Sequence, residues 1–125
     1  MKLYLLDTNI LIYALANKKP WASRFRKWIK DKQAAISAIT AAEFLTGASP
    51  QEAKKFELFL DEFGTLPVET STARLAAEYR KEFLRQGRNL KLPDCLIAAT
   101  AKYYQATLVT FNRSDYPMKD ITILS

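Results

Sequence analysis

The stretch that decides the fold is Leu3-Tyr4-Leu5-Leu6-Asp7-Thr8-Asn9, near the start of the chain. Its first four residues are all apolar, which is typical of a strand that is buried on both faces in a parallel sheet. The apolar run stops at Asp7, and the residues that follow predict a helix over 10–16. A buried strand that passes directly into a helix indicates an α/β domain. In such domains ligands bind at the carboxyl ends of the strands, where Asp7 stands.

The rest of the chain alternates between helix and strand patterns. Apolar residues at helical spacing predict helices over residues 21–32, 40–47, 50–63, 71–86 and 93–104. Short apolar runs predict strands over residues 34–37, 107–111 and 121–124, with a short edge strand over 65–68. Strands separated by helices indicate a three-layer α/β/α sandwich with a mostly parallel central sheet of about five strands. The 125 residues are expected to form one domain, residues 1–125.

The composition limits the chemistry that is open to the chain. An excess of 19 Lys and Arg over 13 Asp and Glu gives a net charge of +6, which favours an anionic partner such as nucleic acid. There is no histidine, which excludes Ser–His–Asp and Cys–His catalysis and argues against a zinc site. The single cysteine, Cys95, lies in an apolar stretch and is expected to be buried. No segment is suited to span a membrane or to act as a signal peptide, so we expect a cytoplasmic protein.

Acidic residues are expected to meet at one edge of the sheet. Asp7 ends the first strand, and Asp94 begins a helix that runs antiparallel to the strands. Glu43 and Asp115 follow two other strands. Singly, each has a structural explanation, as a helix cap, a turn residue or part of a capping box from Thr40 to Glu43. Together they are harder to explain as caps, because like charges held close repel unless a cation compensates them. A hard cation such as Mg²⁺, which takes oxygen ligands, fits this set.

The motifs that carry these acids resemble those of a PIN domain. They are Leu5-Leu6-Asp7-Thr8-Asn9, Thr40-x-x-Glu43, Pro93-Asp94 before an apolar helix, and Leu108-Val109-Thr110-Phe111-Asn112-x-x-Asp115-Tyr116. Their order, spacing and the total length are most similar to the toxins of VapBC toxin–antitoxin modules. The resemblance implies a Mg²⁺- or Mn²⁺-dependent endoribonuclease that forms a homodimer and is inhibited by a cognate antitoxin protein. It also implies that Asp7, Glu43 and Asp94 are the core metal-binding acids.

The resemblance leaves the fourth metal-binding position open. Members of the family place an acid either where Asn112 or where Asp115 stands, and this chain has an amide at the first position. We predict that Asp115 is the fourth ligand and that Asn112 assists it. Thr8, Asn9 and Thr110 are predicted to orient the ligands without binding the metal themselves. Tyr116 replaces a common Phe, a change that we interpret as minor.

Two basic clusters are candidates for contacting RNA. The first lies in residues 18–32, where Trp21, Phe25 and Trp28 are interleaved with Lys and Arg, although their helical spacing favours a core role. The second cluster leads into Asp94, and its position beside the acids makes it the better candidate. The RNA-binding residues proposed from both clusters are Arg24, Lys27, Arg85, Arg88 and Lys91.

The leading hypothesis is hydrolysis of RNA phosphodiester bonds by a water that one or two Mg²⁺ ions activate. A phosphatase-like hydrolase with Asp7 as nucleophile is an alternative, but Asn9 stands where a second acid would support it. A second alternative is a non-catalytic RNA-binding or partner-binding module in which the acids serve as caps. For the implied homodimer, apolar surface is available from Trp21, Phe44 or the helix over 50–63.

Overall fold

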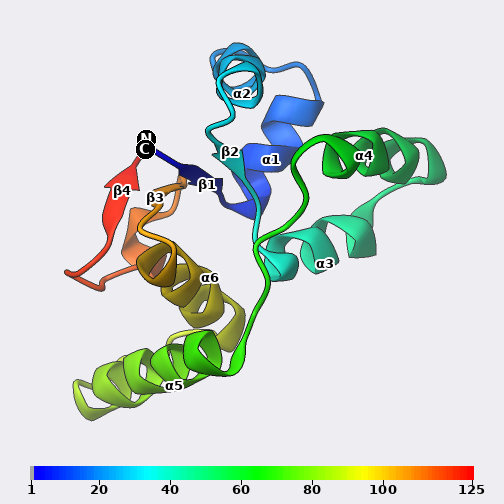
Figure 1. Cartoon of the computed structure of the whole chain (residues 1–125). Coiled ribbons are helices and arrows are strands. Elements are labelled where there is room, and N and C mark those ends of the chain that lie inside the picture. The colour runs from blue at the N-terminus through cyan, green and yellow to red at the C-terminus, as the bar shows by residue number, and fades with distance from the viewer. Residues whose placement is uncertain (1) are drawn as a thin grey trace.

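The computed structural model describes residues 2–125 and contains a parallel sheet in the strand order β2-β1-β3-β4 (Figure 1). The strands are β1 (Tyr4–Leu6), β2 (Ala34–Ala35), β3 (Thr107–Val109) and β4 (Thr122–Leu124). The helices are α1 (Thr8–Leu15), α2 (Trp21–Lys30), α3 (Ala38–Gly47), α4 (Pro50–Phe63), α5 (Thr70–Arg85) and α6 (Leu92–Tyr103), with a 3-10 turn η1 (Arg113–Asp115). The predicted α/β class is confirmed.

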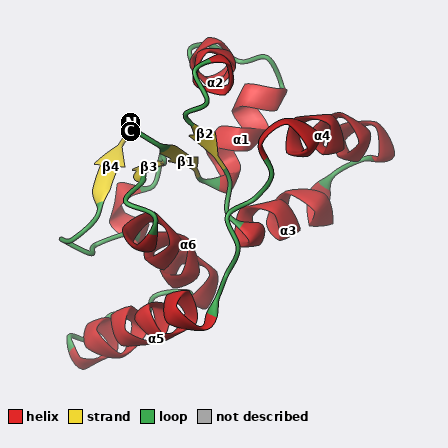
Figure 2. Cartoon of the chain, viewed as in Figure 1, coloured by secondary structure: helices red, strands yellow, loops and turns green. Residues whose placement is uncertain are grey.

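Helices cover both faces of the sheet, as the apolar β1 run predicts (Figure 2). Leu5 and Leu108 point to one face and pack against α5 and α6, in a core that includes Ala76 and Ile97. Leu6 and Val109 point to the other face, into a core built from α1 to α4. Alternate residues of each strand therefore enter different cores, because successive side chains point to opposite sides of a sheet. The three-layer arrangement is confirmed.

The sheet has fewer strands than the five predicted. Residues 65–68 do not form a strand but make a single parallel bridge, between Leu66 and Ser37. The Leu66 N–H donates to the Ile36 carbonyl at 2.8 Å, and the Leu66 carbonyl accepts from the Ala38 N–H at 2.9 Å. The pairing goes no further because β2 itself spans only two residues and the chain turns into α3 directly after Ser37.

The start of α3 corrects the predicted helix over 40–47. Ser37 is the residue that caps this helix, since its Oγ accepts from the Thr40 N–H at 2.9 Å. The helix therefore begins at Ala38, and Glu43 lies in its second turn rather than closing a capping box with Thr40. This removes one structural explanation for Glu43, whose side chain is free to serve another role.

Burial of the aromatic residues of α2 confirms their core role. Trp21, Phe25 and Trp28 are all buried against the α1 side of the sheet, and Cys95 is buried as predicted on the other side. Trp21 and Phe44 are only 8% and 6% exposed, so neither offers the apolar dimer surface that the sequence suggested. Among residues 2–125, no helix is both long enough and apolar enough to cross a membrane.

Candidate metal and RNA site

Asp7 and Thr110 are brought side by side by the register of the sheet. Leu6 pairs with Val109, so the residues that follow each strand leave the sheet next to each other. Asp7 is 8% exposed and caps α1, its Oδ1 accepting from the Thr8 N–H at 2.7 Å. Its Oδ2 accepts from the Thr110 hydroxyl at 2.9 Å. The carboxylate is therefore fixed by two donors from different elements, and the predicted orienting role of Thr110 agrees with this geometry.

Glu43 is tied to the same edge through Thr8. The Thr8 hydroxyl donates to Glu43 Oε1 at 2.8 Å, and this bond links the first turn of α1 to the second turn of α3. Thr8 thus holds one carboxylate with its backbone and another with its side chain. Asn9, which was also predicted to orient the ligands, is exposed and makes no side-chain hydrogen bond within the described part of the chain.

Asp94 lies in the first turn of α6, at the carboxyl edge of the strands because this helix runs back to the start of β3. Burial raises the pKa of Asp94 to about 6. The next causes are the negative charges of its neighbours, in the order Asp115, Asp7 and Glu43, while Lys91 lowers the pKa. The charges of the other three predicted acids therefore reach Asp94, which is the behaviour expected at a site that binds a cation.

Tyr116 is a site residue whose importance the sequence analysis missed. It is 2% exposed, and its hydroxyl donates to Asp94 Oδ1 over a long contact of 3.4 Å. Asp7 is also within reach of this hydroxyl, which has one proton and so donates to one carboxylate at a time. Burial, followed by the negative charges of Asp7 and Asp94, holds the pKa of Tyr116 well above its usual range, so the phenol stays protonated as a donor. A Phe could not supply this donor, so the Tyr adds a hydrogen bond to the site, and the interpretation of the change as minor stays a prediction.

Asp115 stands in η1 and lines a cleft together with Asp94 and basic residues. The cleft has a volume of about 230 Å³, and Arg88 and Lys91 form its basic side. Asn112 contributes through its backbone, whose N–H donates to Thr110 Oγ1 at 3.0 Å, while its side chain is exposed. Between the two candidates for the fourth acid position, Asp115 is thus the one that lines the cleft with Asp94.

The donor set fits a hard cation that keeps part of its water shell. None of the four acids forms an ion pair within residues 2–125, so no Lys or Arg neutralises them directly. In the same residues, no three acidic side chains converge closely enough to make a finished metal cage. Mg²⁺ commonly binds through one or two carboxylates plus waters and substrate phosphates, so an open group of carboxylates is compatible with it.

Comparison with known proteins places this geometry in a family. The family model of the PIN domain matches residues 4–120. The chain belongs to the PIN domain family. Ribonuclease VapC2 of Rickettsia felis is 32% identical over 121 residues, covering 91% of this chain and 90% of the relative. A tRNA(fMet)-specific endonuclease VapC of Shigella flexneri is 29% identical, covering 90% of this chain and 89% of the relative.

Solved structures match the whole of this PIN domain. The chain aligns with a structure of DNA-bound VapBC from Salmonella typhimurium with a TM-score of 0.85 and 26% identity, covering 99% of this chain and 98% of the other. A structure of VapBC2 from Rickettsia felis, bound to a promoter DNA fragment, gives a TM-score of 0.84 and 26% identity, covering 98% and 97%. The likeness runs along the full length of the fold and is not confined to the sheet.

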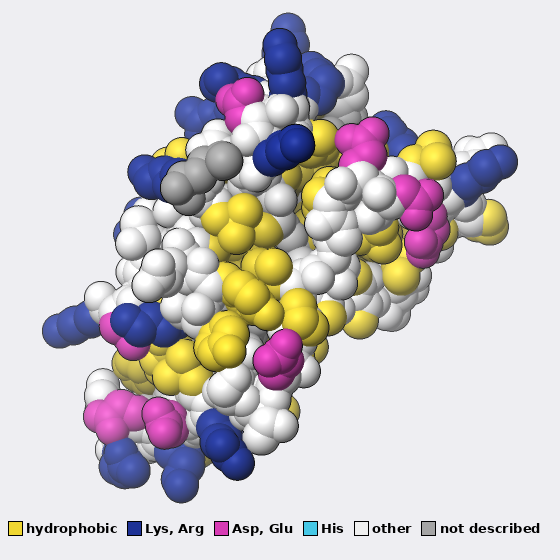
Figure 3. All heavy atoms as spheres, in the orientation of Figure 1, with side chains coloured by type: hydrophobic (Ala, Val, Ile, Leu, Met, Phe, Trp, Pro, Cys, Tyr) yellow, Lys and Arg dark blue, Asp and Glu magenta, His cyan; other side chains and the backbone are white. Residues whose placement is uncertain are grey.

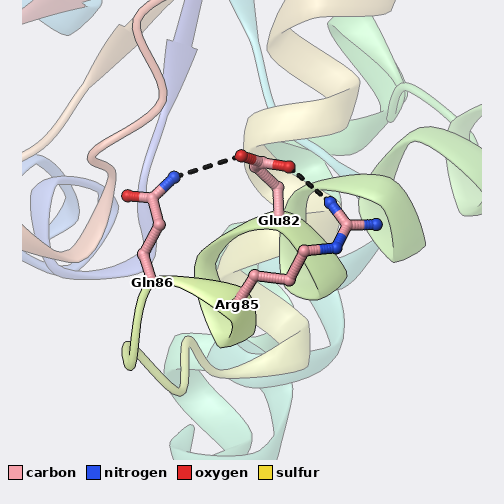
Figure 4. A network of polar contacts seen from close by, with 3 residues as sticks. All are labelled: Glu82, Arg85 and Gln86. Atoms are coloured by element: carbon pink, nitrogen blue, oxygen red, sulfur yellow. Dashed lines mark hydrogen bonds and ion pairs between the residues drawn. The ribbon is translucent and has the colours of Figure 1, made fainter.

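The predicted RNA-binding residues of this PIN domain divide into two groups. Arg88 and Lys91 line the acidic cleft, and Arg88 is held there by donating to the Ser114 carbonyl at 2.9 Å. Arg85 instead pairs with Glu82 at 2.6 Å, beside Gln86 on the same helix (Figure 4). The structure therefore places Arg88 and Lys91, but not Arg85, in the cleft that holds Asp94 and Asp115.

The two candidates on α2 do not line the acidic cleft. Lys27 pairs with Asp31 at 2.9 Å, and the Arg24 guanidinium lies 4.9 Å from the Trp21 ring. The buried aromatics of this helix do not offer the stacking surface that the sequence pattern suggested.

A larger cavity than the acidic cleft lies away from the acids. It has a volume of about 610 Å³ and runs along the β2 edge, between the ends of α2 and α4. Glu62 is its one acidic residue, beside Lys30 and Lys32. This cavity has no convergent catalytic groups, and we base the site on the chemistry at the carboxyl edge rather than on cavity size.

Proposed function

We propose that this PIN domain is a Mg²⁺-dependent endoribonuclease and the toxin of a toxin–antitoxin pair. The observation that carries the proposal is the gathering of Asp115, Asp7 and Glu43 around Asp94, where burial and then these three charges raise the pKa of Asp94 and no described ion pair neutralises the acids. The names of the VapC relatives, which are ribonucleases and a tRNA endonuclease, support the choice of RNA as substrate. An RNA substrate in turn supports a cytoplasmic location.

Asp7, Glu43, Asp94 and Asp115 are the residues that would hold the cation, with Mn²⁺ as a possible substitute for Mg²⁺. When bound, a divalent cation supplies an activated water and stabilises the charge that develops on the phosphate oxygens. The chain contributes orientation. Donors from Thr8 and Thr110 fix both oxygens of Asp7, which leaves the remaining lone pairs to face the ligand.

Arg88 and Lys91 supply the positive charge that an RNA backbone needs to approach a group of acids. Both line the cleft that holds Asp94 and Asp115. A phosphate entering this cleft would meet a cation-binding side and a basic side, and charge-assisted bonds from Arg to phosphate are among the stronger protein hydrogen bonds. The two residues thereby balance the repulsion between the acids and the substrate.

The alternatives from the sequence make different use of the same residues. A phosphatase-like role for Asp7 is disfavoured because Asn9 stands where a second acid would support it. A non-catalytic binding module is compatible with the capping role of Asp7 but gives no reason for Asp94 and Asp115 to share a cleft.

The partner is proposed to be a cognate antitoxin protein. Solved structures of similar fold are described as VapBC and toxin–antitoxin complexes, which supports such a partner for this chain. A homodimer is proposed from the family resemblance and stays a prediction. Of the suggested dimer surfaces, α4 remains, with Leu58 63% exposed.

The proposal is tested by adding Mg²⁺ to the metal-free protein in a calorimeter and then measuring cleavage of single-stranded RNA. We expect specific Mg²⁺ binding and cleavage for the parent chain, with both lost in Asp94→Asn. The matched control is Asp61→Asn, which makes the same change at an exposed position of α4. Absence of Mg²⁺ binding by the parent would favour the non-catalytic module, and cleavage by Asp94→Asn at the parental rate would contradict the site.

A further inference from the structure

An exposed aromatic pair lies beside the site and was not singled out in the sequence. Tyr13 of α1 and Phe111, which follows β3, are 40% and 41% exposed. Their rings meet edge to face, with centroids 5.0 Å apart and planes at 62°. Two large aromatic side chains that are held together yet left in solvent present a continuous apolar surface, which marks a binding site more often than a lone exposed residue does.

Basic side chains lie next to this aromatic pair. The Lys18 ammonium lies 4.5 Å from the Tyr13 ring centroid, and Trp21 packs its edge against Phe111 at 5.5 Å. Arg24 lies over Trp21 in turn, and Figure 3 shows Lys and Arg side chains gathered over α2 at the top of the molecule. An aromatic surface bordered by fixed positive charge suits a ligand with flat rings and an anionic backbone. Single-stranded nucleic acid has this combination.

The pair is also within reach of an RNA bound at the acids. Phe111 directly follows Thr110, whose hydroxyl holds Asp7. Tyr13 stands six residues beyond Asp7 on the helix that Asp7 caps, a rise of about 9 Å along the axis. A single strand spaces its nucleotides at least as widely as the rise of about 3.4 Å in a duplex, so this rise corresponds to no more than about three nucleotides.

We propose that Tyr13 and Phe111 form a base-binding subsite, on which an unpaired base of the RNA substrate stacks one to three nucleotides from the scissile phosphate. Lys18 and Arg24 contact the phosphates that flank this base. The proposal rests on the proposed ribonuclease function. It adds a second place at which the protein binds the RNA, outside the acidic site. It implies a substrate that is single-stranded next to the cleaved bond.

The test measures RNA affinity by fluorescence anisotropy in EDTA, where no metal-dependent cleavage takes place. The variants are Phe111→Leu and Tyr13→Leu, which keep apolar volume and remove the aromatic face. The matched control is Tyr103→Leu, because Tyr103 is 48% exposed and also meets a neighbour, Tyr104, edge to face at 5.1 Å. Tyr103 ends α6, about 13 Å along the helix axis from Asp94.

We expect each subsite variant to bind a short labelled single strand about 10-fold more weakly, within the range for loss of one stacked base, and the control to bind like the parent. A second arm replaces each base of the strand in turn by an abasic site. One position should weaken binding to the parent but should have little further effect on Phe111→Leu, because base and ring belong to one contact. Circular dichroism verifies that each variant is folded.

Parental affinity in both subsite variants, or an equal loss in Tyr103→Leu, would overturn the subsite. If RNA affinity is unchanged but binding of a protein partner is lost, the surface serves that partner and the RNA assignment is wrong. The results distinguish failure of the subsite from failure of the proposed function. RNA that binds with the expected pattern but is not cleaved in Mg²⁺ contradicts the nuclease, whereas cleavage without any effect of Phe111→Leu contradicts the subsite alone.

Discussion

Asp94→Asn should stabilise the metal-free protein while it abolishes cleavage. On folding, the pKa of Asp94 rises from its ordinary value of 3.8 to about 6, chiefly because the carboxyl is buried and lies near other acids. A shift of this size corresponds to about 3 kcal/mol when the group is ionised in the folded state. Because the side chain is partly exposed and solvent screens such charges, we take about 1–2 kcal/mol as the stabilisation expected in the variant.

The pH dependence of stability has a definite sign. The folded chain binds this proton more tightly than the unfolded chain, so protonation of Asp94 stabilises the fold. That stabilisation is complete below pH 3.8 and is lost as the pH rises through about 6. The advantage of Asp94→Asn over the parent should therefore be large at pH 7.5 and small at pH 4.

The assay is thermal unfolding in EDTA at both pH values. For a chain of this length, about 1–2 kcal/mol corresponds to a rise in Tm of about 3–8 °C at pH 7.5. Asp61→Asn is again the matched control and should leave Tm unchanged, since its carboxyl is exposed on α4. Addition of Mg²⁺ should raise the Tm of the parent but not that of Asp94→Asn. An unchanged or lower Tm for the variant at pH 7.5, or a difference that is the same at pH 4, would refute the reasoning.

Four further outcomes are expected. Asp115→Ala should reduce RNA cleavage more than Asn112→Ala, and the reverse ranking would move the fourth position to Asn112. Tyr116→Phe should keep the fold but weaken Mg²⁺ binding several-fold by calorimetry, because Asp94 loses its buried donor; unchanged affinity would show the hydroxyl to be dispensable. Mg²⁺ affinity and cleavage rate should fall as the pH drops through about 6, because Asp94 becomes protonated there. EDTA should stop the reaction, and cleavage at full rate in EDTA would exclude the mechanism. A co-expressed antitoxin should suppress cleavage through an Arg or Lys that faces Asp7 and Asp94, and replacing that residue should weaken the suppression.

The parts of the fold that could be predicted from the sequence are those fixed by local pattern. Continuous apolar runs gave β1 and β3, and their order along the chain gave a parallel sheet with Asp7 and Asp94 at its carboxyl edge. The helix over 50–63 was predicted with its observed bounds from its apolar spacing, and the structure adds a capping box of Ser49 and Glu52 at its start. These features depend on few residues that are close in the sequence, so no knowledge of the packing was required.

The missed features depend on contacts between distant segments. Ser37 and Thr40 are both good caps, and the backbone path after β2, rather than either side chain, selects Ser37. The role of Tyr116 depends on its hydroxyl reaching Asp94 from another element, which the substitution of Phe by Tyr does not reveal. Tyr13 and Phe111 lie at opposite ends of the sequence, so only the folded sheet brings the two rings together.

The two parts of the acidic site differ in how firmly they are held. Asp7 and Thr110 extend from β1 and β3, whose buried neighbours Leu6 and Val109 pack in one core, so the sheet fixes this pair against electrostatic repulsion. The other three acids come from α3, the first turn of α6 and the turn η1, outside the sheet. This arrangement explains why the acids repel one another without forming a finished cage. In the proposed function, Asp7 with its donor Thr110 would define where a cation binds, and the other three acids would complete its surroundings once the cation and an RNA phosphate are bound.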